Sequence, residues 1–333
     1  MRQLLIFFSF LIFLLFFLVW TFGPREPAEI ATDKKNFDIG LSVDSYLWSR
    51  EIIFDDLIKG AEKKVLWANK TDFKTPISII YIHGFTASSM ELRPVPEIIA
   101  SNLGANIFFT RLTGHGRTSL AMEEASVSRW LNDVDEALEI GRRLGEKVII
   151  LANSTGGTLA AAAAVSNARM ENVVGIVFIS PNFGVNNIAA KMLSWPFARY
   201  WVPWIIGDFQ TSKPRNPNHE KFWTTTYPTV SLMPMAALVK SVMEANYRAV
   251  KIPALFYFSL DDKVVQPQKT LLFASNWGGD VSIINPILGS RDDKLSHIVA
   301  GEIVSPGQTE FAVETILIWI KSLSIESGFN EFF

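Results

Sequence analysis

Hydrophobic positions occur in two kinds of segment along this chain. The first is an almost unbroken apolar run from Leu4 to Phe22. The second is a series of short apolar runs, separated by stretches with helical spacing, at 77–84, 106–112, 147–153 and 173–181. Continuous apolar strands that alternate with helices are typical of a parallel sheet covered on both faces. The pattern predicts an α/β fold with a mostly parallel central sheet and helices on both faces.

The amino-terminal run predicts a transmembrane helix. Its 19 residues span roughly 28 Å in helical form, close to the hydrocarbon thickness of a bilayer. The run is longer than a typical signal-peptide core of about 7 to 15 residues, and no small-x-small cleavage motif precedes Gly23. We therefore expect residues 1–23 to be an uncleaved signal anchor, with the rest of the chain on the non-cytoplasmic (periplasmic or extracytoplasmic) side. If the segment is cleaved, the protein is secreted.

The remaining pattern divides the chain into four further segments. Residues 24–74 are polar and are expected to be a linker and amino-terminal extension, with a helix or strand around 43–58. Residues 75–182 form the first part of the α/β core. Residues 183–250 break the rhythm with tryptophans among prolines, which indicates an insertion above the sheet. Residues 251–333 resume the pattern and complete the core.

Composition narrows the classes of function. The 333 residues carry a formal net charge of −2, so the chain lacks the basic field that nucleic-acid binding requires. Cysteine is absent, which excludes thiol nucleophiles, disulfides and thiolate metal ligands. Hydrophobic residues make up 49% and charged residues 19%, which favours ordered structure over a long disordered region.

A serine lies between the strand at 147–153 and an alanine-rich helix. The stretch Ala152-Asn153-Ser154-Thr155-Gly156 fits the nucleophile-elbow pattern G-x-S-x-G, with alanine in the first small position. The residues two before and two after the serine must be small, because the sharp turn brings these two residues against the backbone. In parallel sheets, catalytic groups collect at the carboxyl ends of strands, where this serine is expected. The alternative is a plain strand-turn-helix in which the serine only caps the helix.

A serine nucleophile requires a base, and a carboxylate that orients the base. Of the four histidines, only His297 follows the strongest acidic candidate, in the loop before the last helix. That candidate is Asp262, where the strand in FYFSLDD ends, and its neighbour Asp261 is the alternative acid. The chain order Ser154, Asp262, His297 is the order of the triad in α/β-hydrolases.

These motifs make residues 75–322 resemble the α/β-hydrolases, and in detail the monoacylglycerol lipase and lysophospholipase-like serine carboxylesterases. The matching motifs are an oxyanion loop, a glycine-histidine-glycine loop, the elbow and the acid motif: YIHGF, RLTGHGRTS, ANSTGG and SLDDKVVQP. Two positions depart from the family pattern. Ser259 stands where glycine is usual in the acid motif, and Arg111 stands where the glycine-histidine-glycine loop often has aspartate. We therefore do not expect this chain to form a salt bridge that depends on the family's aspartate in that loop.

The resemblance implies an acyl-enzyme mechanism. Ser154 would attack an acyl carbonyl, His297 would take and return the proton, and Asp262 would stabilise the imidazolium. The backbone N–H groups of Phe85 and Thr155 would form the oxyanion hole. The resemblance implies neither a metal nor an organic cofactor.

In the same resemblance, the insertion at 183–250 would be a lid. Its apolar side chains favour a hydrophobic acyl ester, such as an acylglycerol or a lysolipid, as substrate. Two other functions stay open: a non-catalytic binding protein with this fold, and a serine peptidase or acyltransferase with the same triad. The sequence fixes neither the acyl length nor the oligomeric state.

The other three histidines receive structural interpretations. His83, in the oxyanion loop, is expected to hydrogen-bond to the backbone, and His115 to brace a turn between two glycines. His219 is expected at the surface of the insertion. None of them has the spacing of the zinc motif H-E-x-x-H.

Overall fold

The chain folds around a seven-stranded sheet with the strand order β1-β3-β2-β4-β5-β8-β9. A computed structural model describes residues 2–326. Strand β1 is antiparallel to β3, and every other pair in this sheet is parallel. The strands are β1 (Lys64–Leu66), β2 (Thr75–Ile82), β3 (Asn106–Phe109), β4 (Gly145–Asn153), β5 (Val173–Ile179), β8 (Ala254–Tyr257) and β9 (Val281–Ile284). The predicted α/β fold with a mostly parallel sheet is confirmed.

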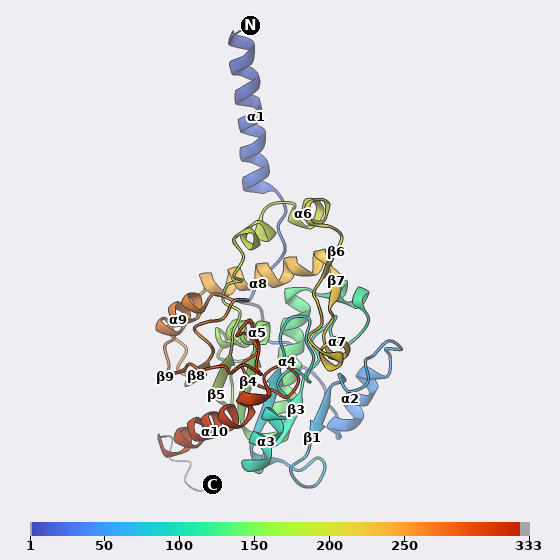
Figure 1. Cartoon of the computed structure of the whole chain (residues 1–333), viewed down its shortest axis with the longest axis vertical. Coiled ribbons are helices and arrows are strands. Elements are labelled where there is room, and N and C mark those ends of the chain that lie inside the picture. Colours follow the sequence, from blue (N-terminus) through green and yellow to red (C-terminus); the bar gives the residue numbers. More distant parts are fainter. Residues whose placement is uncertain (1, 327–333) are drawn as a thin grey trace.

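Helices cover both faces of the sheet (Figure 1). One face packs against α4 (Val127–Leu144), α5 (Thr155–Ala164) and α9 (Pro267–Ser275), and the opposite face against α3 (Val95–Asn102) and α10 (Thr309–Glu326). Short 3-10 helices, η1 (Ser119–Glu124) and η4 (Pro306–Gln308), precede α4 and α10. This arrangement buries the sheet in a three-layer core.

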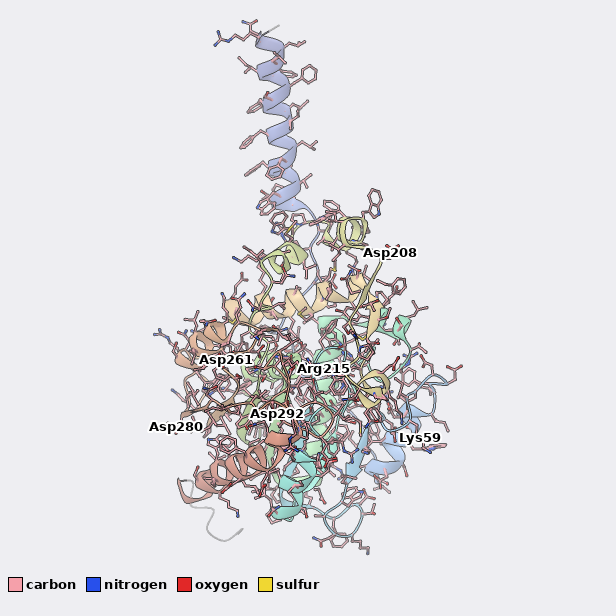
Figure 2. The ribbon with its side chains drawn as sticks, viewed as in Figure 1. Lys59, Asp208, Arg215, Asp261, Asp280 and Asp292 are labelled. Atoms are coloured by element: carbon pink, nitrogen blue, oxygen red, sulfur yellow. The ribbon has the colours of Figure 1, made fainter. Side chains whose placement is uncertain are left out.

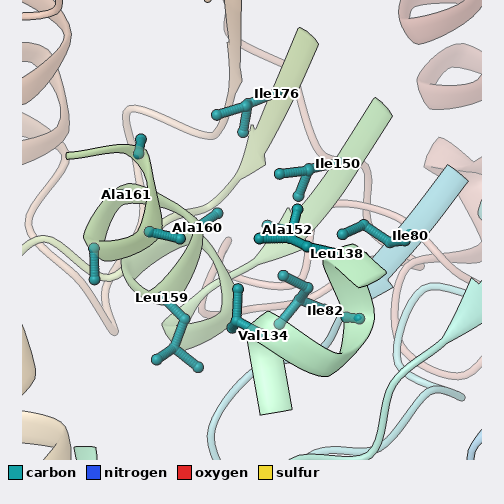
Figure 3. Packing of buried hydrophobic residues seen from close by; sticks show 14 of the residues in the cluster. Ile80, Ile82, Val134, Leu138, Ile150, Ala152, Leu159, Ala160, Ala161 and Ile176 are labelled. Atoms are coloured by element: carbon teal, nitrogen blue, oxygen red, sulfur yellow. The ribbon is translucent and has the colours of Figure 1, made fainter. Parts of the chain in front are cut away.

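The two faces of the central strand β4 explain its continuous apolar sequence. Val148, Ile150 and Ala152 point into the cluster shared with α4 and α5, part of which Figure 3 shows. Ile149 and Leu151 point into the cluster on the other face. Successive side chains of a strand alternate between the two faces of the sheet. A strand that is covered on both sides is therefore apolar on both faces.

Residues 24–74 pack closely against the core. They contain α2 (Val43–Glu51) and the edge strand β1, and four of their apolar side chains are buried with the α4 cluster: Ile30, Ile39, Val43 and Leu47. Further along the chain, Arg169 pairs with Asp135 at 2.8 Å and donates to the carbonyl oxygen of Thr32 at 2.9 Å. The segment predicted as a linker and extension is thus fixed to the body along much of its length.

Residues 183–250 form an inserted segment above the carboxyl ends of the strands. It contains η2 (Ile188–Ser194), α6 (Ala198–Ile206), the antiparallel pair β6 (Phe209–Thr211) and β7 (Thr226–Pro228), α7 (Pro217–Phe222), η3 (Thr229–Ser231) and α8 (Leu232–Glu244). Helix α8 packs on α5, while η2 and α6 lie farther from the sheet (Figure 1).

Helix α1 (Arg2–Phe22) extends away from the body beside the inserted segment (Figure 1). None of its residues is buried, and its 21 residues are long and apolar enough to cross a membrane. A helix that is hydrophobic on all sides requires a partner other than water.

Candidate active site

Ser154 lies on a strained turn between β4 and α5. Its backbone has φ 50° and ψ −117°, a conformation that costs a non-glycine residue about 1–3 kcal/mol. The turn is fixed because the Ser154 N–H donates to Ile179 O at 2.9 Å and the Ser154 carbonyl oxygen accepts from Asn182 N–H at 3.0 Å. Gly156 is needed because a Cβ there would stand 2.2 Å from Ile82 O. These are the backbone features expected of a nucleophile elbow.

Three side chains from separate loops meet at this turn. His297 Nε2 is 3.0 Å from Ser154 Oγ, and His297 Nδ1 is 2.7 Å from Asp262 Oδ2. A carboxylate can only accept, so Nδ1 carries the proton and Nε2 of the neutral ring accepts from the serine hydroxyl. All three residues are buried. The sequence-predicted trio is therefore brought into one hydrogen-bonded chain.

The structure separates the two acidic candidates. Asp262 is buried, and its Oδ1 accepts from Val264 N–H at 2.8 Å and Val265 N–H at 2.9 Å, which leaves Oδ2 directed at the imidazole. Asp261 is exposed at the surface (Figure 2). Asp262 is thus the carboxylate that contacts His297.

Several negative charges surround the imidazole of His297. Burial lowers the pKa of His297, but the charge and hydrogen bond of Asp262, and then the charges of Glu91 and Asp293, raise it above its ordinary value. Asp293 also shapes the histidine loop, because its Oδ2 accepts from the N–H groups of His297 at 3.1 Å and Ile298 at 2.9 Å. Arg215 of the inserted segment pairs with Asp293 at 2.7 Å.

Two backbone N–H groups next to Ser154 have no hydrogen-bond acceptor among residues 2–326. They belong to Phe85, in the loop after β2, and to Thr155, the first residue of α5. The first N–H groups of a helix have no partner within it, so that of Thr155 is available to a ligand. These are the donors predicted for an oxyanion hole, and their role stays a prediction.

Two histidines support the loops beside the serine, as predicted. His83 Nδ1 lies 2.9 Å from Gly84 O, and its Nε2 accepts from Leu112 N–H at 3.1 Å. Burial lowers the pKa of His83 well below its ordinary value, so the ring is neutral. His115 Nδ1 lies 3.2 Å from Thr113 O, and burial lowers the pKa of His115 to about 4.

The prediction for His219 was wrong. His219 is buried, and its ring stacks on Trp223 with centroids 4.5 Å apart. Burial, and then the charge of Arg215, lowers the pKa of His219 to about 4. The short helix α7 turns this polar side chain inward, a placement that the polar sequence around it does not reveal.

Sequence reasoning missed a buried carboxylate beside the serine. Glu91 Oε2 accepts from Gly84 N–H at 2.8 Å, and the Tyr81 hydroxyl donates to the same oxygen at 3.3 Å. Burial raises the pKa of Glu91. Because Gly84 directly precedes Phe85, Glu91 holds the loop that presents the Phe85 N–H. A carboxylate within seven residues of the HG motif was the available signal.

The loop with the glycine-histidine-glycine motif has an ion pair of its own. Arg111, which replaces the usual aspartate, donates from Nη2 to Glu51 Oε1 at 2.7 Å and from Nε to Glu51 Oε2 at 2.8 Å. The partner is thus supplied by α2, so the amino-terminal extension also supports a loop of the site. Among the described residues, no group of three or more histidines and carboxylates is arranged to hold a metal ion.

The inserted segment lies directly against the oxyanion loop. The Phe85 ring meets the Tyr227 ring edge-on at 5.3 Å, and Thr224 N–H donates to Thr86 O at 2.7 Å. Behind the serine, Asn182 contacts the Met235 sulfur of α8 at 3.3 Å. The inserted segment therefore contacts the Phe85 loop and, through Asn182, the backbone behind Ser154.

Comparison with known proteins places the chain among hydrolases. The model of the family described as serine aminopeptidase, S33, matches residues 75–284. A thermostable monoacylglycerol lipase from Bacillus sp. (strain H-257) is 28% identical over 192 residues, which cover 58% of this chain and 73% of the relative.

Solved structures show the same fold at low identity. A structure from a study of metagenome-derived lipolytic enzymes has a TM-score of 0.64 at 20% identity and covers 80% of this chain and 99% of its own. A soluble variant of monoglyceride lipase from Saccharomyces cerevisiae has a TM-score of 0.58 at 11% identity, with 90% of this chain and 99% of its own covered.

Proposed function

The chain belongs to the serine aminopeptidase, S33, family of α/β-hydrolases and is a hydrolase, and from this premise we propose that it is a membrane-anchored serine carboxylesterase for hydrophobic acyl esters. The observation that carries the proposal is the continuous hydrogen-bonded chain from Ser154 through His297 to Asp262, beside two unpaired N–H donors. In this proposal residues 1–23 anchor the protein, 24–74 brace it, 183–250 form a lid, and 75–182 with 251–333 form the catalytic core.

The proposed reaction proceeds in two halves. Ser154 Oγ attacks the acyl carbonyl while His297 Nε2 takes its proton, and the oxyanion accepts hydrogen bonds from the N–H groups of Phe85 and Thr155. Loss of one such donor costs comparable enzymes about 3–4 kcal/mol. His297 then returns the proton to the leaving alcohol, and water hydrolyses the acyl-enzyme by the same route. Every group that this scheme needs lies on the described chain, so it calls for no cofactor.

Hydrophobic esters are proposed because of the surroundings of the serine. The inserted segment places the aromatic ring of Tyr227 against Phe85, in the loop beside the serine. Aromatic surface next to the site favours acyl chains over charged groups. The relatives named as monoacylglycerol lipases support the same substrate class. The amino-terminal helix α1, exposed along its length, would hold the enzyme beside lipid-derived substrates on the non-cytoplasmic side of the membrane.

The test is hydrolysis of p-nitrophenyl esters of rising acyl length by the full chain in detergent, beside Ser154→Ala. We expect ester turnover that falls at least about 10³-fold in the variant, with unchanged thermal unfolding, because the hydroxyl is the attacking group. Aminoacyl p-nitroanilides provide the matched peptidase substrates. Turnover of the anilides without the esters would reassign the enzyme as a peptidase, and full ester turnover by Ser154→Ala would remove Ser154 as the nucleophile.

A further inference from the structure

The outer surface of the inserted segment exposes large apolar side chains. Trp204 is 90% exposed and Ile205 is 68% exposed, both on α6. The outer apolar face comprises these two and four neighbours on η2, α6 and the turn between them: Ile188, Trp195, Tyr200 and Ile206. Burial of each large apolar side chain is worth about 1.5–3 kcal/mol, so a cluster of this kind marks an interaction surface.

This face is continuous with the amino-terminal helix. The ring of Trp20, near the end of α1, meets the ring of Trp195 edge-on at 5.3 Å. Phe197 N–H donates to Pro24 O at 2.8 Å, and Arg199 pairs with Glu26 at 2.7 Å. Figure 1 shows α6 beside the end of α1 where the helix meets the body. The end of the helix and the outer apolar face therefore form one packed unit.

The short connection limits how far this unit lies from a membrane that α1 spans. Only Gly23 separates the last residue of α1 from Pro24, which is bonded to the inserted segment. Two extended residues reach about 7 Å. The polar interface of each leaflet is roughly 5–7 Å thick. Pro24 and the Phe197 backbone bonded to it consequently lie within the depth of the interface if α1 fills the hydrocarbon core, and the outer apolar face adjoins them.

The residue types of the face suit that depth. Tryptophan and tyrosine prefer the membrane-water interface, and the face contains Trp195, Tyr200 and Trp204. Arg199 is the single charged residue within α6, and Glu26 neutralises it. The next acidic residue, Asp208, lies on the side of α6 toward the body (Figure 2). Asp208 thus borders the face, and the exposed Lys191 is the single charged residue of η2.

We infer that the outer apolar face is a second membrane contact, which lies in the lipid interface of the leaflet where α1 ends. The occupant is the bilayer itself. The inference rests on the proposed anchoring of α1 and extends it: α1 holds the chain, and the face orients the body so that the lid meets the bilayer. Acyl esters in that leaflet then have a short path to the lid.

The absence of cysteine allows a direct test on the full chain. We would reconstitute Ile205→Cys into phosphatidylcholine vesicles, label the cysteine with a nitrobenzoxadiazole dye, and measure quenching by lipids with a doxyl group high on the acyl chain. The matched control is Ile318→Cys, at a side chain that is 63% exposed. It belongs to α10, a helix at the opposite end of the molecule from α1 (Figure 1). Turnover of a soluble p-nitrophenyl ester shows that both labelled proteins are folded.

The dye at position 205 should lose about half of its emission to the doxyl lipid, since interfacial helices lie about 5–10 Å into the boundary of headgroups and acyl chains. The dye at position 318 should respond to aqueous iodide and not to the lipid. If vesicle-bound protein shows equal quenching by lipid and by iodide at both positions, the inference is overturned, while the proposed anchoring by α1 is retained. Shielding from iodide without quenching by lipid indicates a second copy over the face and also overturns it. Protein that does not float with the vesicles overturns the anchor and the inference together.

Discussion

At the scale of single residues, the candidate site depends on polar groups whose partners come from distant parts of the chain. Ser154 and Asp262 could be predicted because each lies in a recognisable local motif, and His297 because it is the only histidine that follows both in the chain. Glu91 and Asp293 could not, since a carboxylate in a loop is usually solvated, and only the fold shows that these two support the loops beside the serine.

The assignment of the acid is testable with two neighbouring aspartates. Asp262→Asn removes the charge that contacts the imidazole and should lower kcat by up to about 10⁴-fold on a p-nitrophenyl ester. Asp261→Asn should leave kcat within about twofold, because Asp261 is exposed and its side chain makes no contact with the triad in the described structure. A large loss in Asp261→Asn beside an active Asp262→Asn would reassign the acid.

The pH profile of the same variants reports the charge around His297. The imidazole must be neutral to accept the serine proton, so kcat/KM should fall as the pH drops through the pKa of His297, which is raised above 6.5. In Asp262→Asn the largest raising contribution to the pKa of His297, the charge of Asp262, is lost, so this pKa falls. The acid limb of the residual activity should therefore move to lower pH. An unchanged acid limb would show that another group controls it.

At the scale of elements, the short β4–α5 connection determines where the nucleophile lies. Strand β4 was predictable because its apolar run is continuous, and α5 because alanine and the two glycines allow close packing behind the turn. Helix α3 begins only at Val95, because Leu92 and the loop before it are held in the core. The boundaries thus depended on tertiary packing.

Gly156→Ala tests this connection. The added Cβ would stand 2.2 Å from Ile82 O and 2.7 Å from His83 O, so α5 or the end of β2 must shift. We expect a loss of about 1–3 kcal/mol in the free energy of unfolding and a lower kcat, because the shift displaces the loop that carries the Phe85 N–H. Denaturant unfolding and ester turnover measure both effects.

The matched control is Gly289→Ala, where the nearest atom to an added Cβ is Asp292 Oδ2 at 3.4 Å. It should change the free energy of unfolding by less than about 0.5 kcal/mol, since surface substitutions usually do. If Gly156→Ala is as mild as this control in both measurements, the close approach at the elbow is not required.

At the scale of the whole molecule, the amino-terminal residues have more roles than their sequence suggests. The sequence predicted a polar linker for residues 24–74 because the apolar residues that are buried there are few and irregularly spaced. In the structure Arg169 and Asp135, both almost completely buried, fix the segment to α4, and Glu51 supports the glycine-histidine-glycine loop through Arg111. Long-range ion pairs of this kind leave no periodic pattern. The extension therefore joins α1, the outer apolar face and the α/β core into one body.

If Ser154 is an activated nucleophile, a reagent that labels only such serines will react with it. The full chain would be treated with a fluorophosphonate, digested and analysed by mass spectrometry, beside Ser154→Ala and His297→Ala. We expect one adduct, on the peptide that contains Ser154. It should be absent in Ser154→Ala and form far more slowly in His297→Ala, because the base is lost. A folded wild-type chain that remains unlabelled at Ser154, or is labelled equally in His297→Ala, would contradict this expectation.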